Sequence, residues 1–462
     1  MHSRFLVIGA GLSGLAAAIR LARFNEDVLL IEKHSRAGGL NSYYYRHNRL
    51  FETGLHAITN YAPRSVKKAP LNRLLRQLKI NRDEISFHEQ TKSEIAFLPG
   101  NSLVFSNDFE ELLSNIAIHF SSQTDGFAEL VKKISDYDPF APASYISSRQ
   151  VLHSYISDQR LVDMILCPLL FYGSSWEDDI DFSQFVIMFR SIFLEGMFRP
   201  GGSIKQFLDL LLNKLKHFGG RIRLASEITR ISHKDKKVNS VILDNGETIT
   251  CDYLISTIGS DETTTLLGNK PITGTSGRLG FVENIFQIPS STRALLPADR
   301  TCIFYNDGER FSFRKPDESV DLSSGVICLP FNFEGLEGER DFIEVRTTHL
   351  ANFDIWHTVS SDKSRYEALK IEKAASSSAI AEKIIGSFSD QIVFQDSFTP
   401  LTIQRYTGKI EGAIYGSPHK IKNGITDYQN LFIAGTDQGF LGIVGSMLSG
   451  VSMVNQHILS RM

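Results

Sequence analysis

Three glycines near the start of the chain are spaced to hold a phosphate group. Gly9, Gly11 and Gly14 follow the apolar run at residues 4–8 and open an apolar segment of helical spacing. In such a turn the first glycine permits the bend, the second lets the backbone approach a pyrophosphate, and the third lets the helix pack against the strand. The helix N-terminus then faces the phosphates with unpaired N–H groups. The residues assigned to this site are Gly9, Gly11, Leu12, Ser13 and Gly14.

A carboxylate follows the next apolar run at the distance expected for a ribose contact. Residues 28–31 are typical of a second strand, and Glu32 stands at its end. A carboxylate there accepts a hydrogen bond from the adenosine ribose, so an unmodified ribose is preferred over a 2′-phosphate. Strand, glycine turn, helix, strand and acid in this order predict a dinucleotide-binding fold.

The segment after Glu32 favours FAD over NAD. It carries Lys33 and Arg36, and Arg36 offers a guanidinium fork suited to a diphosphate. Gly38 and Gly39, followed by Leu40, allow a close backbone approach that NAD domains do not generally need. An ordinary glycine turn beside a solvated arginine is the alternative for this segment alone.

The C-terminal region repeats the pattern of strand, glycine turn and helix. An apolar strand at 430–434 runs into a glycine turn, and a helical run follows. The helix N-terminus would face a pyrimidine oxygen of a flavin, and Asp437 would accept a ribitol hydroxyl. A close-packed strand-to-helix connection is the alternative. The cofactor-binding residues predicted here are Gly435, Asp437, Gly442, Ile443 and Val444. Because both ends of the chain would meet on one long cofactor, we predict FAD.

These motifs resemble the FAD-dependent desaturase, isomerase and amine oxidase superfamily. Within it, residues 51–56, 411–416 and 435–445 are similar to motifs of the phytoene desaturase, carotenoid isomerase and retinol saturase group. The resemblance implies an α/β fold, in which a Rossmann-like FAD-binding domain of glutathione reductase type, similar to p-hydroxybenzoate hydroxylase, carries an inserted α+β substrate domain. In relatives, the segment equivalent to that around Ile228 meets the adenine through backbone groups.

Changes of pattern along the chain predict a discontinuous arrangement. Glycine turns disappear from about residue 70 to 195, and short mixed strands fill about 263 to 399. We therefore predict a FAD-binding domain made of 1–69, 197–262 and 400–462. A substrate and membrane-associated domain would comprise 70–196 and 263–399.

Two strongly apolar helices are expected in the first insertion, at 161–172 and 185–198. Their side chains either pack the core of an α-rich cap, or line a lipid-sized tunnel or sit in a membrane interface. The side chains concerned in the second helix are Phe185, Ile187, Met188, Phe189, Ile192, Phe193, Met197 and Phe198.

The resemblance implies hydride transfer between flavin N5 and a C–C bond of a long, apolar polyene or isoprenoid-type lipid. Desaturation, saturation and isomerisation share this architecture, so the direction stays open. Candidate catalytic residues are His56 and Glu52 as proton donors, and Tyr415 as a platform or donor at the ring. The alternatives are a His56 that bonds backbone and a Tyr415 that only packs. Without a motif for NADPH, a separate electron donor or acceptor is expected.

Two other classes compete with this interpretation. A flavin amine oxidase would need an aromatic cage at the flavin. A prenyl-binding dissociation inhibitor resembles the same fold but binds lipidated proteins without flavin. The intact glycines Gly11, Gly14, Gly38 and Gly39 count against the second class.

Composition and residue spacing give no support for nucleic-acid binding, a metal site or a membrane-spanning helix. A net charge of −3 gives no reason to expect nucleic acid as a partner. Four scattered cysteines without C-x-x-C spacing are expected to be buried thiols, and no metal site follows from the histidines. No apolar stretch reaches about 18 residues and no signal region precedes the first strand. We therefore expect a cytoplasmic protein that associates with a membrane surface peripherally.

Overall fold

The N-terminal strand, the helix after it and the next strand form the predicted unit. The computed structural model describes residues 1–54, 56–141, 143–272, 274, 276–336 and 341–461, so Leu55 of the 51–56 motif lies outside the described residues. Strand β1 (His2–Ile8) leads into α1 (Leu12–Ala22) and β2 (Val28–Ile31). β1 pairs in parallel with β2 on one side and with β13 (Thr248–Ser256) on the other. The β1–α1–β2 unit predicted from the glycine spacing is therefore confirmed.

The first sheet gathers strands from three distant parts of the chain. Its order is β10-β2-β1-β13-β12-β11, and β19 pairs with β13. Phe5 and Val7 of β1 pack against the helices on one face, and Leu6 and Ile8 pack on the other. Both faces are buried, as in most parallel sheets. The additional elements are β10 (Arg221–Arg223), β11 (Ile228–Lys234), β12 (Lys237–Leu243), β19 (Leu431–Ile433), α8 (Ile204–His217) and α13 (Gly442–His457).

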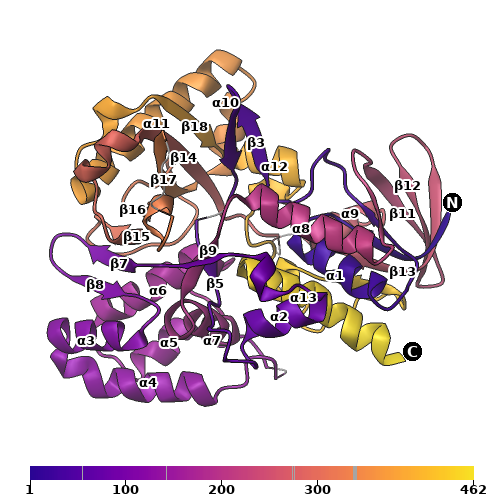
Figure 1. The fold of residues 1–462 in the computed structure, drawn as a ribbon, viewed down its shortest axis with the longest axis horizontal. Helices are drawn as coiled ribbons and strands as arrows, with labels where there is room; N and C mark the ends of the chain where they lie inside the picture. Colours follow the sequence, from indigo (N-terminus) through magenta and orange to yellow (C-terminus); the bar gives the residue numbers. More distant parts are fainter. Residues whose placement is uncertain (55, 142, 273, 275, 337–340, 462) are drawn as a thin grey trace.

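The second sheet is mostly antiparallel and runs in the order β18-β14-β17-β16-β15-β7-β8. One face packs against α11 (Lys363–Ile385), and the other packs against the helical layer drawn at the lower left of Figure 1. Its strands are β7 (Lys92–Phe97), β8 (Ser102–Phe105), β14 (Gly280–Pro289), β15 (Arg300–Asn306), β16 (Ser324–Cys328), β17 (Phe342–Ala351) and β18 (Phe394–Phe398). They come from the two ranges that we predict to form the substrate domain.

The helical layer corrects one expectation. The first apolar helix is α6 (Gln159–Gly173), but the second, α7 (Phe182–Phe189), continues only as a π-helical turn, Arg190–Leu194. Gly196 then adopts a φ of +95°, which ends the helix and lets the chain enter β9 (Met197–Pro200). The layer's other helices are α3 (Phe109–His119), α4 (Thr124–Asp136) and α5 (Ser148–His153).

Of the two roles stated for the second apolar segment, the structure supports core packing and not a tunnel lining or a membrane interface. Phe185, Phe189 and Ile192 are fully buried in the core that joins the helices to the second sheet. Core packing therefore explains the density of aromatic residues in this segment. Among the described residues, no helix is long and apolar enough to cross a membrane.

Short elements connect the sheets. The hairpin of β3 and β4 rises between the second sheet and α12, near the centre of Figure 1. A further sheet has three strands in the order β5-β9-β6. These remaining elements are β3 (Tyr43–Arg46), β4 (Arg49–Glu52), β5 (Ile58–Thr59), β6 (Phe87–Glu89), α2 (Pro70–Leu78), α9 (Ser260–Leu266), α10 (Phe353–Val359) and α12 (Pro400–Thr407).

Candidate active site

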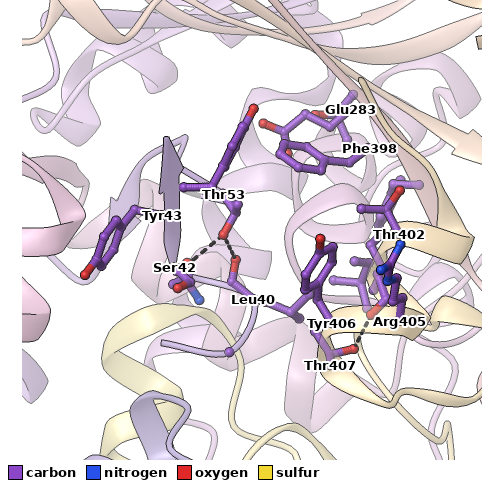
Figure 2. A pocket seen from close by; sticks show the side chains of 18 of the residues that line it. Leu40, Ser42, Tyr43, Thr53, Glu283, Phe398, Thr402, Arg405, Tyr406 and Thr407 are labelled. Atoms are coloured by element: carbon purple, nitrogen blue, oxygen red, sulfur yellow. Dashed lines mark hydrogen bonds between the residues drawn. The ribbon is translucent and has the colours of Figure 1, made fainter. Parts of the chain in front are cut away.

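A cavity of about 930 Å³ extends from the end of β2 to the second sheet. Figure 2 shows part of its wall, with Leu40, Ser42 and Thr53 on one side and the α12 side chains on the other. Thr53 ties two parts of this wall together, because its hydroxyl donates to the Leu40 carbonyl and accepts from the Ser42 N–H, both at 2.9 Å. The volume lies at the upper end of the range for ligand sites.

The glycine turn before α1 borders open space. A Cβ at Gly14 would lie 1.9 Å from the carbonyl oxygen of Gly9, so this glycine is required by the packing of helix against strand. A Cβ at Gly11 would meet no protein atom within 4 Å. Protein packing therefore does not require glycine at position 11, whereas close approach of a ligand would.

Ser13 provides a direct test of whether a pyrophosphate fits here. Its hydroxyl is buried in the first turn of α1 and has no hydrogen-bond partner in the described part of the protein. Gly39 lies against the glycine turn, since its Cβ would lie 3.3 Å from the Gly11 Cα, and the Gly38 N–H donates to the Ala10 carbonyl at 2.8 Å. An unpaired hydroxyl at a helix N-terminus beside an open glycine turn suits a phosphate oxygen. The residues present fit a dinucleotide.

Glu32 and Arg36 both line the cavity. The two carboxylate oxygens of Glu32 accept from the N–H groups of Ala10 at 2.7 Å and His34 at 2.8 Å, which leaves further lone pairs for a ribose hydroxyl. Arg36 donates to the Tyr43 carbonyl at 3.3 Å and so is held against the cavity wall.

The C-terminal turn meets the N-terminal one. A Cβ at Gly450 of α13 would lie 2.1 Å from the Ser13 carbonyl, so α13 crosses α1 in close contact. Gly442 and Ile443, at the start of α13, line the cavity. The two chain ends therefore reach one cavity. Of the residues predicted to bind a cofactor, those that line the cavity are Glu32, Arg36, Gly39, Leu40, Gly442 and Ile443. Those outside its lining are Gly9, Gly11, Leu12, Ser13, Gly14, Lys33, Gly38, Ile228, Gly435, Asp437 and Val444.

Asp437 differs from its predicted role at a ribitol. It is 1% exposed, and its carboxylate accepts from the N–H of Ser260 at 2.6 Å and of Ser417 at 3.0 Å. Burial raises the pKa of Asp437, but the charges of Lys409 and Lys420 lower it by more. The pKa therefore lies below its ordinary value, and the carboxylate stays ionised. Asp437 does not line the cavity, whereas its neighbour Thr436 does. The Asp437 oxygens are bound by protein donors instead.

Glu52 likewise serves the fold. One carboxylate oxygen accepts from Arg199, and the other accepts from the N–H of Ile204, the first residue of α8. It therefore satisfies a helix N-terminus and a buried guanidinium. Glu52 does not line the cavity, and the predicted role as a proton donor is not supported by this geometry.

His56 lines the cavity and is paired with a carboxylate that the sequence did not single out. Its Nε2 lies 3.4 Å from Oε1 of Glu283 on β14 and 3.3 Å from the Thr348 hydroxyl. Burial lowers the pKa of His56, but the charge and hydrogen bond of Glu283 raise it, and the balance is upward. Glu283 itself lies 3.3 Å from the guanidinium of Arg346, which is buried on β17.

Tyr415 lines the cavity with its ring, while its hydroxyl donates to the Phe171 carbonyl at 2.6 Å. Burial raises the pKa of Tyr415, so the phenol remains protonated. This engaged hydroxyl agrees with the packing interpretation of Tyr415 rather than with a proton donor.

Comparison with known proteins assigns the chain to a family. A family model described as flavin containing amine oxidoreductase matches residues 12–368. The chain belongs to this family. Its cofactor is FAD, and it is a flavin-dependent oxidoreductase.

Several curated relatives of this flavin oxidoreductase are similar over nearly its whole length. It is 22% identical to 4,4'-diaponeurosporene oxygenase of Staphylococcus haemolyticus, over 90% of this chain and 87% of that protein. It is 21% identical to all-trans-retinol 13,14-reductase of Macaca fascicularis, over 99% and 85%. Prolycopene isomerase 1 of an Oncidium hybrid cultivar is 20% identical, over 91% and 76%. These findings confirm the resemblance stated from the motifs.

Solved structures confirm the fold. An oxidoreductase from Methanosarcina mazei superposes with a TM-score of 0.69 at 16% identity, covering 99% of this chain and all of that one. A Rab GDI from Plasmodium falciparum gives 0.52 at 10% identity, covering 94% and 92%. The flavin oxidoreductase thus has the predicted Rossmann-like FAD-binding fold.

Sequence analysis missed three residues of this site: Glu283, Thr348 and Thr436. Glu283 and Arg346 are charged residues inside mostly buried strands. A charge in such a strand is a usable signal, because a buried charge requires a partner. The partner itself could not be found from spacing.

Proposed function

We propose that this flavin oxidoreductase transfers hydride between FAD and a C–C bond of a long apolar lipid of the polyene or isoprenoid type. The main support for this proposal is the cavity, because it joins the dinucleotide end at Glu32 and Arg36 to a second, largely apolar end. The apolar and aromatic residues of that end, which share one packed cluster, are Phe171, Tyr172, Phe281, Ile414, Tyr415 and Val326. The names of the relatives, which refer to carotenoids, retinol and prolycopene, support this substrate class.

The chain's own residues hold the cofactor in this proposal. The backbone at Gly11 and Gly39 and the Ser13 hydroxyl would hold the pyrophosphate, and Arg36 would add a positive charge. Glu32 would bind the adenosine ribose, and the resemblance implies that backbone groups near Ile228 would meet the adenine. The N-terminus of α13 and Thr436 would hold the other end of the cofactor, which would supply hydride transfer.

The aromatic end of the cavity positions the substrate and excludes water. Tyr415 meets Phe281 edge to face, with ring centroids 6.2 Å apart, and its hydroxyl is held by α6. Phe171 and Tyr172 of α6 add two further walls. Rings fixed in this way orient a flat, conjugated chain and keep water from its reacting carbons.

His56 holds the proton in this mechanism. Because Nε2 is held by Glu283 and Thr348, the proton moves at Nδ1. The charged ring donates this proton to a substrate carbon in the direction of saturation, and the neutral ring accepts a proton there in the direction of desaturation. Glu283 is a positioning residue, because it orients the imidazole and stabilises its charged form. Glu52 and Tyr415, named as candidates from the sequence, take structural roles in this mechanism.

The domain limits stated above, 1–69, 197–262 and 400–462 for FAD and 70–196 with 263–399 for substrate, form part of the proposal. The proposal also includes a separate electron donor or acceptor. It further includes a cytoplasmic location and a peripheral association with membranes, from which the protein would take a long lipid. Flotation with liposomes tests the association. Protein that stays at the bottom of the gradient argues for a substrate delivered in water.

The visible absorption spectrum tests the proposed reaction. A panel of polyenes and their more saturated counterparts is added anaerobically to oxidised and to pre-reduced protein. Bleaching of the flavin bands by the more saturated compound assigns a desaturase, and reoxidation by a polyene assigns a saturase. Reduction by amines alone would assign an amine oxidase, and a lack of flavin bands after reconstitution would assign a lipid-binding protein.

A further inference from the structure

Two of the four cysteines face each other across strands of the second sheet. Cys302 of β15 is in register with Cys328 of β16 in an antiparallel pair. Next to them, the Leu329 N–H donates to the Thr301 carbonyl at 2.8 Å, which makes Cys302 and Cys328 a non-hydrogen-bonded pair. In such pairs the Cα atoms lie about 4.5 Å apart, within the range of about 4.4–6.8 Å that disulfides span. Both thiols are free in this structure.

The pair lies on the face of the sheet that borders the cavity. Side chains two residues apart on a strand share a face, and Val326, two residues before Cys328, lines the cavity. The Tyr172 hydroxyl lies 3.4 Å from the Cys302 sulfur, and the Cys328 thiol donates to the His56 carbonyl at 3.7 Å. Tyr172 and His56 both line the cavity. The two thiols therefore lie one side chain behind its wall.

The two thiols differ in acidity. The neighbouring Cys328 thiol lowers the pKa of Cys302, with further lowering by Tyr172 and the charge of Arg199, against the effect of burial. Burial, together with Cys302, raises the pKa of Cys328. The Tyr172 hydroxyl can donate to the Cys302 sulfur, whereas the Cys328 thiol faces the His56 carbonyl, which accepts its proton. Because the thiolate is the nucleophile, this arrangement assigns Cys302 as the attacking sulfur and Cys328 as the resolving one.

We propose that Cys302 and Cys328 are a redox-active dithiol that hydrogen peroxide converts to a disulfide. The Cys302 thiolate attacks one peroxide oxygen, the O–O bond breaks, and the hydroxide that leaves takes up the proton that Cys302 had lost. The Cys328 sulfur then attacks the Cys302 sulfur, the S–O bond of the sulfenic acid breaks, and a second water leaves with the Cys328 proton. Two thiols are oxidised and one peroxide is reduced to two waters.

Burial selects the oxidant. Cys302 and Cys328 are both 0% exposed, so a peroxide, which is close to water in size, can reach the site through a small opening, whereas a glutathione-sized disulfide cannot. Disulfide formation removes the Cys328 thiol proton, so the hydrogen bond to the His56 carbonyl is lost. It also changes the sulfur that the Tyr172 hydroxyl contacts from a thiol to a disulfide. The oxidation state of the pair thus reaches two side chains of the cavity. This inference is independent of the substrate proposed above.

Thiol counting tests the pair. The purified protein is treated with hydrogen peroxide, denatured, alkylated and digested. We expect the four thiols to fall to two, a peptide cross-link between 302 and 328, and the return of four thiols with dithiothreitol. Cys167→Ser and Cys251→Ser are matched controls, because these buried cysteines lie outside the pair, and each variant should still lose two thiols. Persistence of four thiols, or a cross-link that uses Cys167 or Cys251, overturns the proposal.

A second variant tests the order of attack without activity as a readout. In Cys328→Ser the resolving thiol is absent, so peroxide leaves a sulfenic acid at position 302, which dimedone traps when the protein is denatured in its presence. We expect the adduct on Cys302 in this variant, and little adduct on Cys328 in Cys302→Ser. Equal labelling of the two variants, or labelling at Cys251 alone, contradicts the assignment of Cys302 as the nucleophile.

Discussion

The imidazole Nε2 of His56 lies 3.4 Å from Oε1 of Glu283, inside the wall of the large cavity. The two residues are 12% exposed at their side chains and come from the turn after the β3–β4 hairpin and from β14. Arg346 holds the same carboxylate from β17. The pair therefore joins the hairpin to the second sheet and aims an ionisable ring at the cavity.

We predict that this pair stabilises the protein most at mildly acidic pH. His56 has a pKa raised above 6.5, so its contribution is complete below that value and is lost as the pH rises through the folded-state pKa. Burial raises the pKa of Glu283, but His56 and Arg346 lower it below 4.5 overall, so its contribution is lost only as the pH falls further. The Tm difference between wild type and His56→Gln should be largest between 4.5 and 6.5. A calorimetric difference that grows above this window contradicts the assigned pair.

The pair of His56 and Glu283 should also affect the rate of turnover. His56→Ala is expected to lower kcat by about a hundredfold or more while FAD stays bound, because positioned proton transfer contributes about 10²–10⁴-fold. Glu283→Gln should lower the pKa of His56 and move the corresponding limb of the kcat/KM profile to lower pH. Stopped-flow and steady-state kinetics over pH measure both. An unchanged profile in Glu283→Gln would return His56 to a structural role.

Glu52→Gln should separate folding from catalysis. The carboxylate binds Arg199 and the first N–H of α8, so its loss is expected to cost about 1–3 kcal/mol of unfolding free energy. Because Glu52 lies outside the cavity, kcat per bound flavin should stay within about twofold. Urea unfolding and single-turnover kinetics measure the two quantities. A large loss of kcat in a variant of normal stability would restore Glu52 as a proton donor.

Gly11→Val and Gly14→Val should fail in different ways. A side chain at position 11 enters open space, so the variant should fold with a normal circular dichroism spectrum but retain no flavin. A side chain at position 14 collides with the Gly9 carbonyl, so that variant should not fold. The visible flavin bands and the thermal melt of each protein measure the contrast. Normal flavin content in Gly11→Val is incompatible with the site assigned here.

Local patterns predicted the β1–α1–β2 unit well, because consecutive apolar runs and a glycine turn determine it within 32 residues. Roles that depend on distant partners were not predictable in this way. Asp437 is held by Ser260, 177 positions away, and Glu52 by Ile204, 152 positions away. A motif shows that an acid is present, but only the assembled fold shows which donors use it.

The same limit applies to register and to helix ends. The facing of Cys302 and Cys328 depends on how β15 and β16 align, which no spacing of cysteines along the chain reveals. The apolar run at 185–198 was correctly expected to be helical at its start, but the conformation of Gly196 redirects the chain into β9. Hydrophobicity alone does not distinguish a core helix from a tunnel lining.

Ser13→Ala should weaken FAD binding and leave the apoprotein unchanged. The Ser13 hydroxyl has no protein partner in the described structure, so its removal costs the empty protein nothing, whereas a hydrogen bond to a charged oxygen is worth about 1.5–3 kcal/mol. We expect the Kd for FAD to rise on the order of ten- to a hundredfold, with an unchanged Tm of the apoprotein. Ser449→Ala is the matched control, because its hydroxyl accepts from the Gly435 N–H at 2.6 Å and donates to Gln438. That variant should lose apoprotein stability instead. Fluorescence titration and thermal melts of both apoproteins decide the comparison, and a Tm loss in Ser13→Ala equal to that of Ser449→Ala would show that the Ser13 hydroxyl serves the fold and not the pyrophosphate.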